Sequence, residues 1–367
     1  MKFVISRDAL LKPLNLVAGV VERRQTLPVL SNVLLVLEGT RLSLTGTDLE
    51  VELVGRVSLP IAGVDGELTV PARKLVDICK SLPEGSDIEF STEDGKVALR
   101  SGRSRFTLST LPAREFPSIE DSIGTHQFTV KQGELRRLID STAFAMAQQD
   151  VRYYLNGMLW ELKDKKMRVV ATDGHRLAMC TLPSRLEKAE DAQIILPRKG
   201  VLELARLLMD ESADIAIVLG SNHLRATTDD FTFTSKLVDG KFPDYERVVP
   251  KSPDKVVTGS RAELRQAFSR AAILSNEKYR GVRLKLLPEA MEIVANNPEQ
   301  EQAEESVPVD YQGEVIEMGF NVTYLMDVLG VLSSEQIKLS LSDPNSSALL
   351  EETESSDSLY VVMPMRL

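Results

Sequence analysis

The strongest constraint on this 367-residue chain is an internal repeat. Its copies share one order of features: a β-like stretch, a helix, a pair of alternating apolar runs, a second helix and another hairpin. Corresponding turns carry Asp48, Asp173 and Asn297, which lie 125 and 124 positions apart. Asp and Asn between alternating runs are typical of hairpin turns. A repeat that carries whole sets of elements predicts tandem similar domains.

The helices of the repeat are indicated by periodicity and by capping residues. Leu135, Leu138, Ile139, Thr142 and Ala143 fall on one helical stripe. Ser260 followed by Glu263 has the pattern of a capping box. The six helices are predicted at residues 7–19, 72–82, 132–148, 198–210, 260–275 and 321–332.

Two matching connectors set the domain boundaries. LPAREFP at 111–117 and LVDGKFP at 237–243 end the first two copies, 126 positions apart. We therefore predict three tandem α+β domains at 1–124, 125–251 and 252–367, each with antiparallel hairpins and two helices.

The charge of the chain is segregated. Its net charge is −10, yet the predicted helices hold 13 Lys or Arg against 8 Asp or Glu. One interpretation places basic helices on a surface that faces a polyanion, with the acidic remainder turned away from it. The alternative is that Lys and Arg are simply good helix formers, although Glu forms helices equally well.

A second segregation involves the two ends of the chain. RSGRSRFTL carries Arg100, Arg103 and Arg105 at strand-like spacing, whereas NPEQEQAEE near the other end is acidic. A head-to-tail contact between identical chains would pair these segments, and such contacts can close into rings. Alternatively, both are solvated charged edges that resist aggregation.

Several classes of function are disfavoured. Cys79 and Cys180 are far apart and form no C-x-x-C motif, so we expect two core thiols in a reducing compartment. The three histidines are not spaced like metal ligands, which argues against a metal site. A P-loop motif is absent, which argues against ATP binding of the P-loop kind. The N-terminus has no signal-peptide pattern, and no apolar run approaches a membrane span. We expect a soluble, cytoplasmic protein without a cofactor.

A catalytic alternative rests on ATDGHR. Asp173, His175 and Arg176 place a carboxylate, an imidazole and a guanidinium within four positions, but no nucleophile elbow accompanies them. Because Asp173 recurs as Asp48 and Asn297, a turn role is favoured over an enzyme site.

The motifs in combination resemble the bacterial DNA polymerase III β subunit family, the sliding clamps. The motifs that carry the resemblance, which spans nearly the whole chain, are LTGTDLE at 44–50, QDVRYYLNGM at 149–158, ATDGHRLA at 171–178, SKLVDGKFPDY at 235–245, AAILSNEK at 271–278 and the terminal YVVMPMRL. The resemblance implies the DNA clamp fold, a non-catalytic homodimeric ring that encircles double-stranded DNA and confers processivity on the replicative polymerase. The implied partners are the polymerase III catalytic subunit, the ATP-driven clamp loader, and other polymerases and repair proteins that dock through short peptide motifs.

The resemblance also implies three sets of residues. The dimer interface would join Lys74, Arg103, Arg105, Phe106 and Leu108 to Ile273, Leu274, Glu301, Glu304 and Glu305. Duplex DNA would face Arg24, Gln149, Arg152, Tyr153, Tyr154, Arg198 and Lys199. A partner-peptide groove would contain Leu155, Thr172, Gly174, His175, Arg176, Leu177, Pro243, Arg247, Val248, Asn321, Tyr324, Ser347, Val361, Val362, Met363, Pro364, Met365, Arg366 and Leu367.

Within the groove, Arg176 and Asn321 would orient the backbone of an extended peptide. Three positions depart from the family pattern: Gln302 replaces an acid, Asn345 replaces an apolar residue, and Arg23 adds a charge.

Overall fold

The computed structural model describes residues 1–21, 27–93, 95–119, 124, 126–187 and 189–366. They form two compact units, one of residues 1–133 and 202–237 and the other of residues 134–201 and 238–367. The sheets run across the predicted domain boundaries, which stay a prediction.

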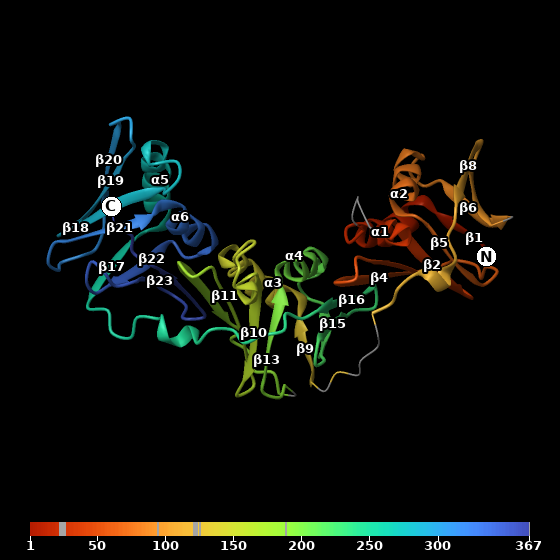
Figure 1. The fold of residues 1–367 in the computed structure, drawn as a ribbon, viewed down its shortest axis with the longest axis horizontal. Coiled ribbons are helices and arrows are strands. Elements are labelled where there is room, and N and C mark those ends of the chain that lie inside the picture. The colour runs from red at the N-terminus through yellow and green to blue at the C-terminus, as the bar shows by residue number, and fades with distance from the viewer. Residues whose placement is uncertain (22–26, 94, 120–123, 125, 188, 367) are drawn as a thin grey trace. The chain divides into compact units, whose positions relative to one another are not determined.

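Six α-helices occur among the described residues, one at each predicted place (Figure 1). Their bounds are α1 Arg7–Ala18, α2 Ala72–Ser81, α3 Gln132–Asp140, α4 Arg198–Leu207, α5 Arg261–Ala271 and α6 Val322–Val331. They hold 13 Lys or Arg and 7 Asp or Glu, so the helices are basic as predicted. The Ser260 side chain accepts a hydrogen bond from the Glu263 amide, as expected for an N-cap.

The helix predicted at 132–148 is wrong in its second half, because α3 ends at Asp140. The Thr142 hydroxyl donates to the Leu138 carbonyl at 2.7 Å, and the Thr142 amide bonds to Ile139. A hydroxyl that competes for helical carbonyls favours such an end. A 3-10 turn at Ala143–Ala145 follows.

The first unit contains a four-stranded sheet, β1-β6-β7-β8, and an eight-stranded sheet, β5-β2-β3-β4-β16-β15-β14-β9. Every strand pair is antiparallel. The strands are β1 Lys2–Ser6, β2 Asn32–Glu38, β3 Arg41–Thr47, β4 Val51–Ser58, β5 Gly66–Pro71, β6 Asp87–Glu93, β7 Lys96–Ser101, β8 Ser104–Ser109, β9 His126–Lys131, β14 Asp214–Leu219, β15 His223–Thr227 and β16 Phe231–Lys236.

The second unit repeats this plan, with a four-stranded sheet, β20-β19-β18-β21, and an eight-stranded sheet, β13-β10-β11-β12-β24-β23-β22-β17. The strands are β10 Gly157–Lys163, β11 Lys166–Thr172, β12 Arg176–Thr181, β13 Ala192–Pro197, β17 Lys255–Ser260, β18 Gly281–Leu287, β19 Ala290–Asn296, β20 Gln302–Pro308, β21 Ile316–Asn321, β22 Gln336–Leu341, β23 Ala348–Glu352 and β24 Ser358–Val362.

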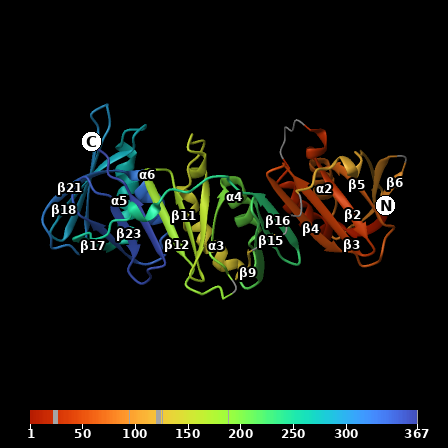
Figure 2. The same cartoon turned by 60° about the horizontal axis from the view of Figure 1, so that its bottom comes forward.

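Each eight-stranded sheet contains one joint between successive repeats. In the first unit β4 pairs with β16 (Figure 2), and in the second β12 pairs with β24. The two joints have the same register, because Leu53 opposes Phe233 in one and Ala178 opposes Tyr360 in the other. The strands β8 and β20 remain at the edges of the four-stranded sheets.

Helix α1 lies close against β3 and β4 because two glycines make room for it. A Cβ on Gly46 would lie 2.7 Å from Val17, and one on Gly55 would lie 2.9 Å from Pro13. Pro13 therefore stays inside the helix and faces the sheet.

Both cysteines are buried free thiols, as expected of core residues. Burial raises the pKa of the Cys79 thiol to about 11, so it stays protonated at neutral pH. Trp160 and Tyr360 are among the largest side chains of the core.

Candidate functional site

The second unit contains an apolar hollow of about 170 Å³. Its walls come from the β11–β12 turn, the connector after β16 and the end of β24. The residues lining it are Arg152, Leu155, Thr172, Gly174, Arg176, Leu177, Pro243, Asp244, Tyr245, Val248, Val361 and Met363. Its floor is continuous with a buried cluster that includes Leu159, Phe242 and Leu349. A small apolar hollow with a few polar groups at its rim suits short apolar ligands.

The β11–β12 turn is fixed by its own side chains. The Thr172 hydroxyl donates to the Arg176 carbonyl at 2.6 Å and accepts the Gly174 amide at 3.1 Å. Asp173 Oδ1 accepts the amides of His175 and Arg176. Gly174 has a φ of 89° and lies against Arg152, so a side chain there would be strained and crowded. Asp173 is thus a turn residue, as the repeat predicted.

The connector wall is anchored through Tyr245. Its hydroxyl donates to Glu161 Oε2 at 2.6 Å and accepts from Arg168 Nη1 at 2.9 Å. Burial and the bond to Glu161 raise the pKa of Tyr245 to about 12, so the phenol stays protonated. This network holds the connector against β10 and β11.

Arg176 is held by several protein groups. Its Nε donates to Asp173 at 3.0 Å, its Nη2 to the Phe144 carbonyl at 2.8 Å, and its Nη1 to Asp327. The ring centroid of Tyr324 lies 4.5 Å from the guanidinium carbon. Asn321 caps α6 by accepting the Thr323 amide. Arg176 and Asn321 therefore hold the walls in place here, and their predicted contact with a peptide backbone stays a prediction.

The structure brings nine of the predicted groove residues to the lining of the hollow: Leu155, Thr172, Gly174, Arg176, Leu177, Pro243, Val248, Val361 and Met363. The others described are not among the lining residues, namely His175, Arg247, Asn321, Tyr324, Ser347, Val362, Pro364, Met365 and Arg366. The tail is anchored by the Met363 amide on the His175 carbonyl and the Met365 amide on the Gly319 carbonyl. Leu367 lies outside the described residues.

Three lining residues, Arg152, Asp244 and Tyr245, were missed in the prediction of the groove. Asp244 and Tyr245 belong to the SKLVDGKFPDY motif, directly after Pro243, which was a usable signal. Arg152 gave no such signal, since only the folded turn brings it to Gly174.

The predicted DNA-facing residues of the second unit surround the 3-10 turn Tyr153–Leu155 and the start of α4. Tyr153 is 58% exposed. Arg152 binds Asp150 through two bonds of 2.9 and 3.0 Å, which lower the pKa of Asp150 to about 2. Gln149 has a φ of 55°, and Arg198 and Lys199 are half-buried. Arg24 and Arg23 lie outside the described residues.

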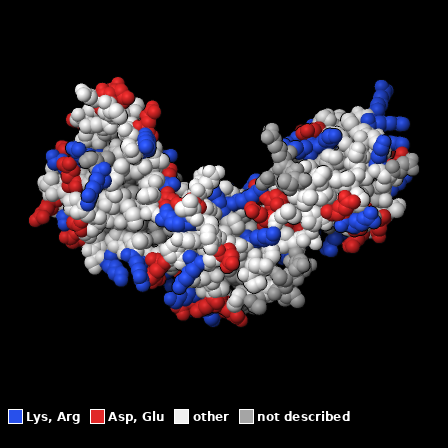
Figure 3. Space-filling view, viewed as in Figure 1, with Lys and Arg blue, Asp and Glu red and all other residues white. Residues whose placement is uncertain are grey.

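The two predicted interface sets lie around the free edge strands. Arg105, Phe106 and Leu108 lie on β8, with Arg103 in the turn before it, and Lys74 is exposed on α2. Glu304 and Glu305 lie on β20, and Glu301 directly precedes this strand. Ile273 is 75% exposed, and Leu274 is half-buried. Figure 3 shows Lys and Arg gathered around the β7–β8 hairpin, and Asp and Glu around the β19–β20 hairpin.

The acidic edge already makes contacts within its own chain. Arg270 binds Glu305 through two bonds of 2.7 Å, and Gln302 donates to Glu304. Asn345 lies in an exposed turn, where its amide bonds to Asp343.

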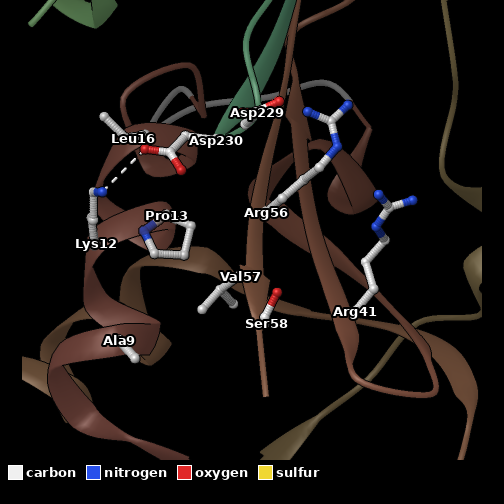
Figure 4. A pocket seen from close by; sticks show the side chains of 10 residues that line it. All are labelled: Ala9, Lys12, Pro13, Leu16, Arg41, Arg56, Val57, Ser58, Asp229 and Asp230. Atoms are coloured by element: carbon white, nitrogen blue, oxygen red, sulfur yellow. Dashed lines mark hydrogen bonds and ion pairs between the residues drawn. The ribbon is translucent and has the colours of Figure 1, made fainter. Parts of the chain in front are cut away.

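A larger hollow of about 430 Å³ in the first unit has mixed charge (Figure 4). Lys12 of α1 binds Asp230 at 3.1 Å, and Arg41 and Arg56 reach in from β3 and β4. Burial and the neighbouring Arg41 lower the pKa of Arg56. An equivalent pair in the second unit joins Arg137 to Asp357 at 3.6 Å, so a charge pair recurs beside each joint.

Among the described residues, no group of three or more His, Cys, Asp or Glu is placed to hold a metal ion. The described helices include none that is long and apolar enough to cross a membrane.

Comparison with protein families gives three matches that together span most of the chain. Residues 1–120 match the N-terminal domain of the DNA polymerase III beta subunit, residues 129–244 its central domain, and residues 246–366 its C-terminal domain.

Individual relatives are similar over their full length. The beta sliding clamp of Pseudomonas aeruginosa is 65% identical and that of Escherichia coli is 52% identical, each with 100% of both chains covered. A crystal structure of the Pseudomonas aeruginosa sliding clamp bound to griselimycin, 65% identical, superposes with a TM-score of 0.98 over 100% of both chains.

Proposed function

This chain belongs to the DNA polymerase III β subunit family, the bacterial sliding clamps, and on that premise we propose that two copies close head to tail into a ring around duplex DNA. The family consists of non-catalytic processivity factors, so the chain serves the replicative DNA polymerase on DNA and is not an enzyme. The catalytic alternative at Asp173, His175 and Arg176 is thereby wrong. A replication protein of this kind would work in the bacterial cytoplasm.

The observation that carries the ring proposal is the pair of unused edge strands. Each intrachain joint pairs the fourth strand of one repeat with the last strand of the next, as β4 with β16 and β12 with β24. By the same rule β20 would pair with β8. Among the described residues of one chain, however, each of these strands lies at the edge of its sheet and the two do not pair. A second copy supplies the missing partner, and the joint then continues the same antiparallel pattern.

The repeat also predicts the register of this intermolecular joint. Phe106 on β8 corresponds to Phe233 and Tyr360, and Ala303 on β20 corresponds to Leu53 and Ala178. If Phe106 opposes Ala303, Arg105 directly opposes Glu304. Opposite charges at facing positions stabilise a strand pair by about 0.2–1 kcal/mol. The charges also favour this pairing over contact between two like edges.

We further propose that the apolar hollow of the second unit binds short peptide segments of partner proteins. Leu155, Leu177, Val361 and the adaptable Met363 supply apolar walls, which suits anchoring side chains of an extended peptide. Griselimycin, to which the Pseudomonas aeruginosa relative is bound, would occupy the same hollow. The polymerase catalytic subunit, the clamp loader and repair proteins would compete for it.

Contact with DNA would be sequence-blind and weak. Tyr153, Tyr154, Arg198 and Lys199 would touch phosphates without reading bases, which allows the ring to slide.

Sedimentation measures the first step of this proposal. The particle in solution should have twice the 40.7 kDa chain mass. A monomer that persists at high protein concentration and low salt would rule out the ring.

A further inference from the structure

The first unit contains a hollow of about 240 Å³ that none of the predicted sites includes. It is lined by Thr47, Leu49, Pro117, Ser118, Ile119, His223 and Lys236. It lies at the end of the β4–β16 joint, as the peptide groove lies at the end of the β12–β24 joint. The proposed peptide groove is the hollow of about 170 Å³ in the second unit.

The two hollows are built from corresponding residues. The Thr47 hydroxyl donates to the Val51 carbonyl at 2.9 Å and accepts the Leu49 amide at 3.1 Å. Thr172 makes the same two bonds, to the Arg176 carbonyl and the Gly174 amide. Leu49 and Gly174 also share a positive φ, of 77° and 89°.

The connectors correspond as well. Pro117, Ser118 and Ile119 stand where the groove has Pro243, Asp244 and Tyr245, in the two connectors that match at a spacing of 126. The strand registers then place Lys236 where the groove has Met363. The first unit therefore repeats the groove's backbone with different side chains.

The decisive difference is Glu52, which stands where the groove has Leu177. Thr47 opposes Glu52 in the β3–β4 ladder, and Thr172 opposes Leu177 in the β11–β12 ladder. Glu52 is 8% exposed, and its carboxylate accepts the Ile119 amide at 3.0 Å. Glu52 is not among the lining residues, so the first-unit hollow lacks the apolar wall that Leu177 gives the groove, and it has a buried carboxylate behind its connector instead.

We infer that the first-unit hollow is a duplicate of the peptide groove that has lost peptide binding, and that Leu49, Glu52 and Lys236 are the residues that exclude an apolar peptide from it. Leu49 places an apolar side chain in the turn where the groove has Gly174, and Lys236 brings a charge where Met363 is apolar. Specificity for one groove per chain thus comes from excluding the ligand at the other joint. This inference rests on the proposed peptide groove.

The test substitutes the groove's residues into the first-unit hollow and uses griselimycin as the probe. Native mass spectrometry counts the griselimycin molecules bound per chain. The full-length wild type should bind one molecule per chain. The variant Leu49→Gly, Glu52→Leu, Lys236→Met should bind two. The matched control Glu67→Leu, Lys96→Met changes exposed residues outside both hollows and should bind one.

Each outcome decides a separate claim. A correctly folded triple variant that still binds one molecule overturns the inference, whereas a wild type that binds none overturns the proposed groove instead. If the triple variant loses its thermal transition, Glu52→Gln with Lys236→Met keeps an acceptor for the Ile119 amide. A second molecule should then bind at high probe concentration, and a count that stays at one overturns the inference.

Discussion

At the scale of single residues, Arg176 and Tyr245 hold the walls of the groove. Arg176 is bound by Asp173, Asp327 and the Phe144 carbonyl, and the Tyr245 hydroxyl by Glu161 and Arg168. The sequence indicated Arg176 through its motif, but the residues that position it come from α6 and the turn after α3. Asp327 lies 151 positions from Arg176 and Phe144 lies 32 positions from it, so spacing along the chain could not predict these contacts.

Asp327 is the first residue we expect to matter without touching a ligand. Asp327→Asn should weaken griselimycin binding about 3- to 10-fold, equivalent to about 1 kcal/mol, because Arg176 loses a charged acceptor. Titration calorimetry measures the change, and Glu354→Gln, at an exposed position of the same unit, is the control.

A double-mutant cycle identifies the route of this effect. In an Arg176→Lys background, Asp327→Asn should change affinity little further. A full additional loss there would show that Asp327 does not act through Arg176.

Tyr245 gives a pH-dependent prediction. Its pKa is about 12 in the folded protein against 10.0 ordinarily, so the unfolded chain releases the proton first as pH rises. The stabilisation is therefore complete below pH 10 and lost toward pH 12, by about 1–3 kcal/mol. Urea unfolding of Tyr245→Phe should show a smaller loss over this range than the wild type. Equal losses would remove Tyr245 as the cause.

At the scale of elements, periodicity and caps predicted all six helices and the three-fold order of strands. The ends of helices were less predictable, as at Asp140, because local hydroxyl bonds decide them. The pairing of β4 with β16 and of β12 with β24 was also beyond sequence reasoning, since nothing local in these strands marks a distant partner. The two intrachain joints nevertheless predict that β8 pairs with β20 of a second copy in the same register.

The register of that intermolecular joint can be tested by cross-linking. Facing residues in antiparallel strands lie about 4.5–5.5 Å apart at Cα, within disulfide range. Arg105→Cys with Glu304→Cys should give covalent dimers on mild oxidation, as seen by non-reducing electrophoresis.

The control for this experiment moves the second cysteine by one position along β20. Arg105→Cys with Ala303→Cys places the thiols on opposite faces of the sheet and should cross-link poorly. Faster cross-linking of the shifted pair would refute the predicted register.

At the scale of the whole molecule, the net charge of −10 is compatible with DNA if the basic helices face the duplex in the proposed ring. A ring needs no tight contact, because a polymerase tethered to it rebinds at a high effective concentration. Retention on DNA then depends on topology, whereas a protein held by 6–10 phosphate contacts loses roughly 10³–10⁵ in affinity between 50 and 200 mM salt.

The most direct measurement loads the protein on nicked circular DNA with a clamp loader and ATP, and then cuts the circle. The proposed ring should stay on the circle at high salt, and after the circle is cut it should slide off the free DNA ends. Release at the same rate from circular and linear DNA would contradict a ring that encloses the duplex.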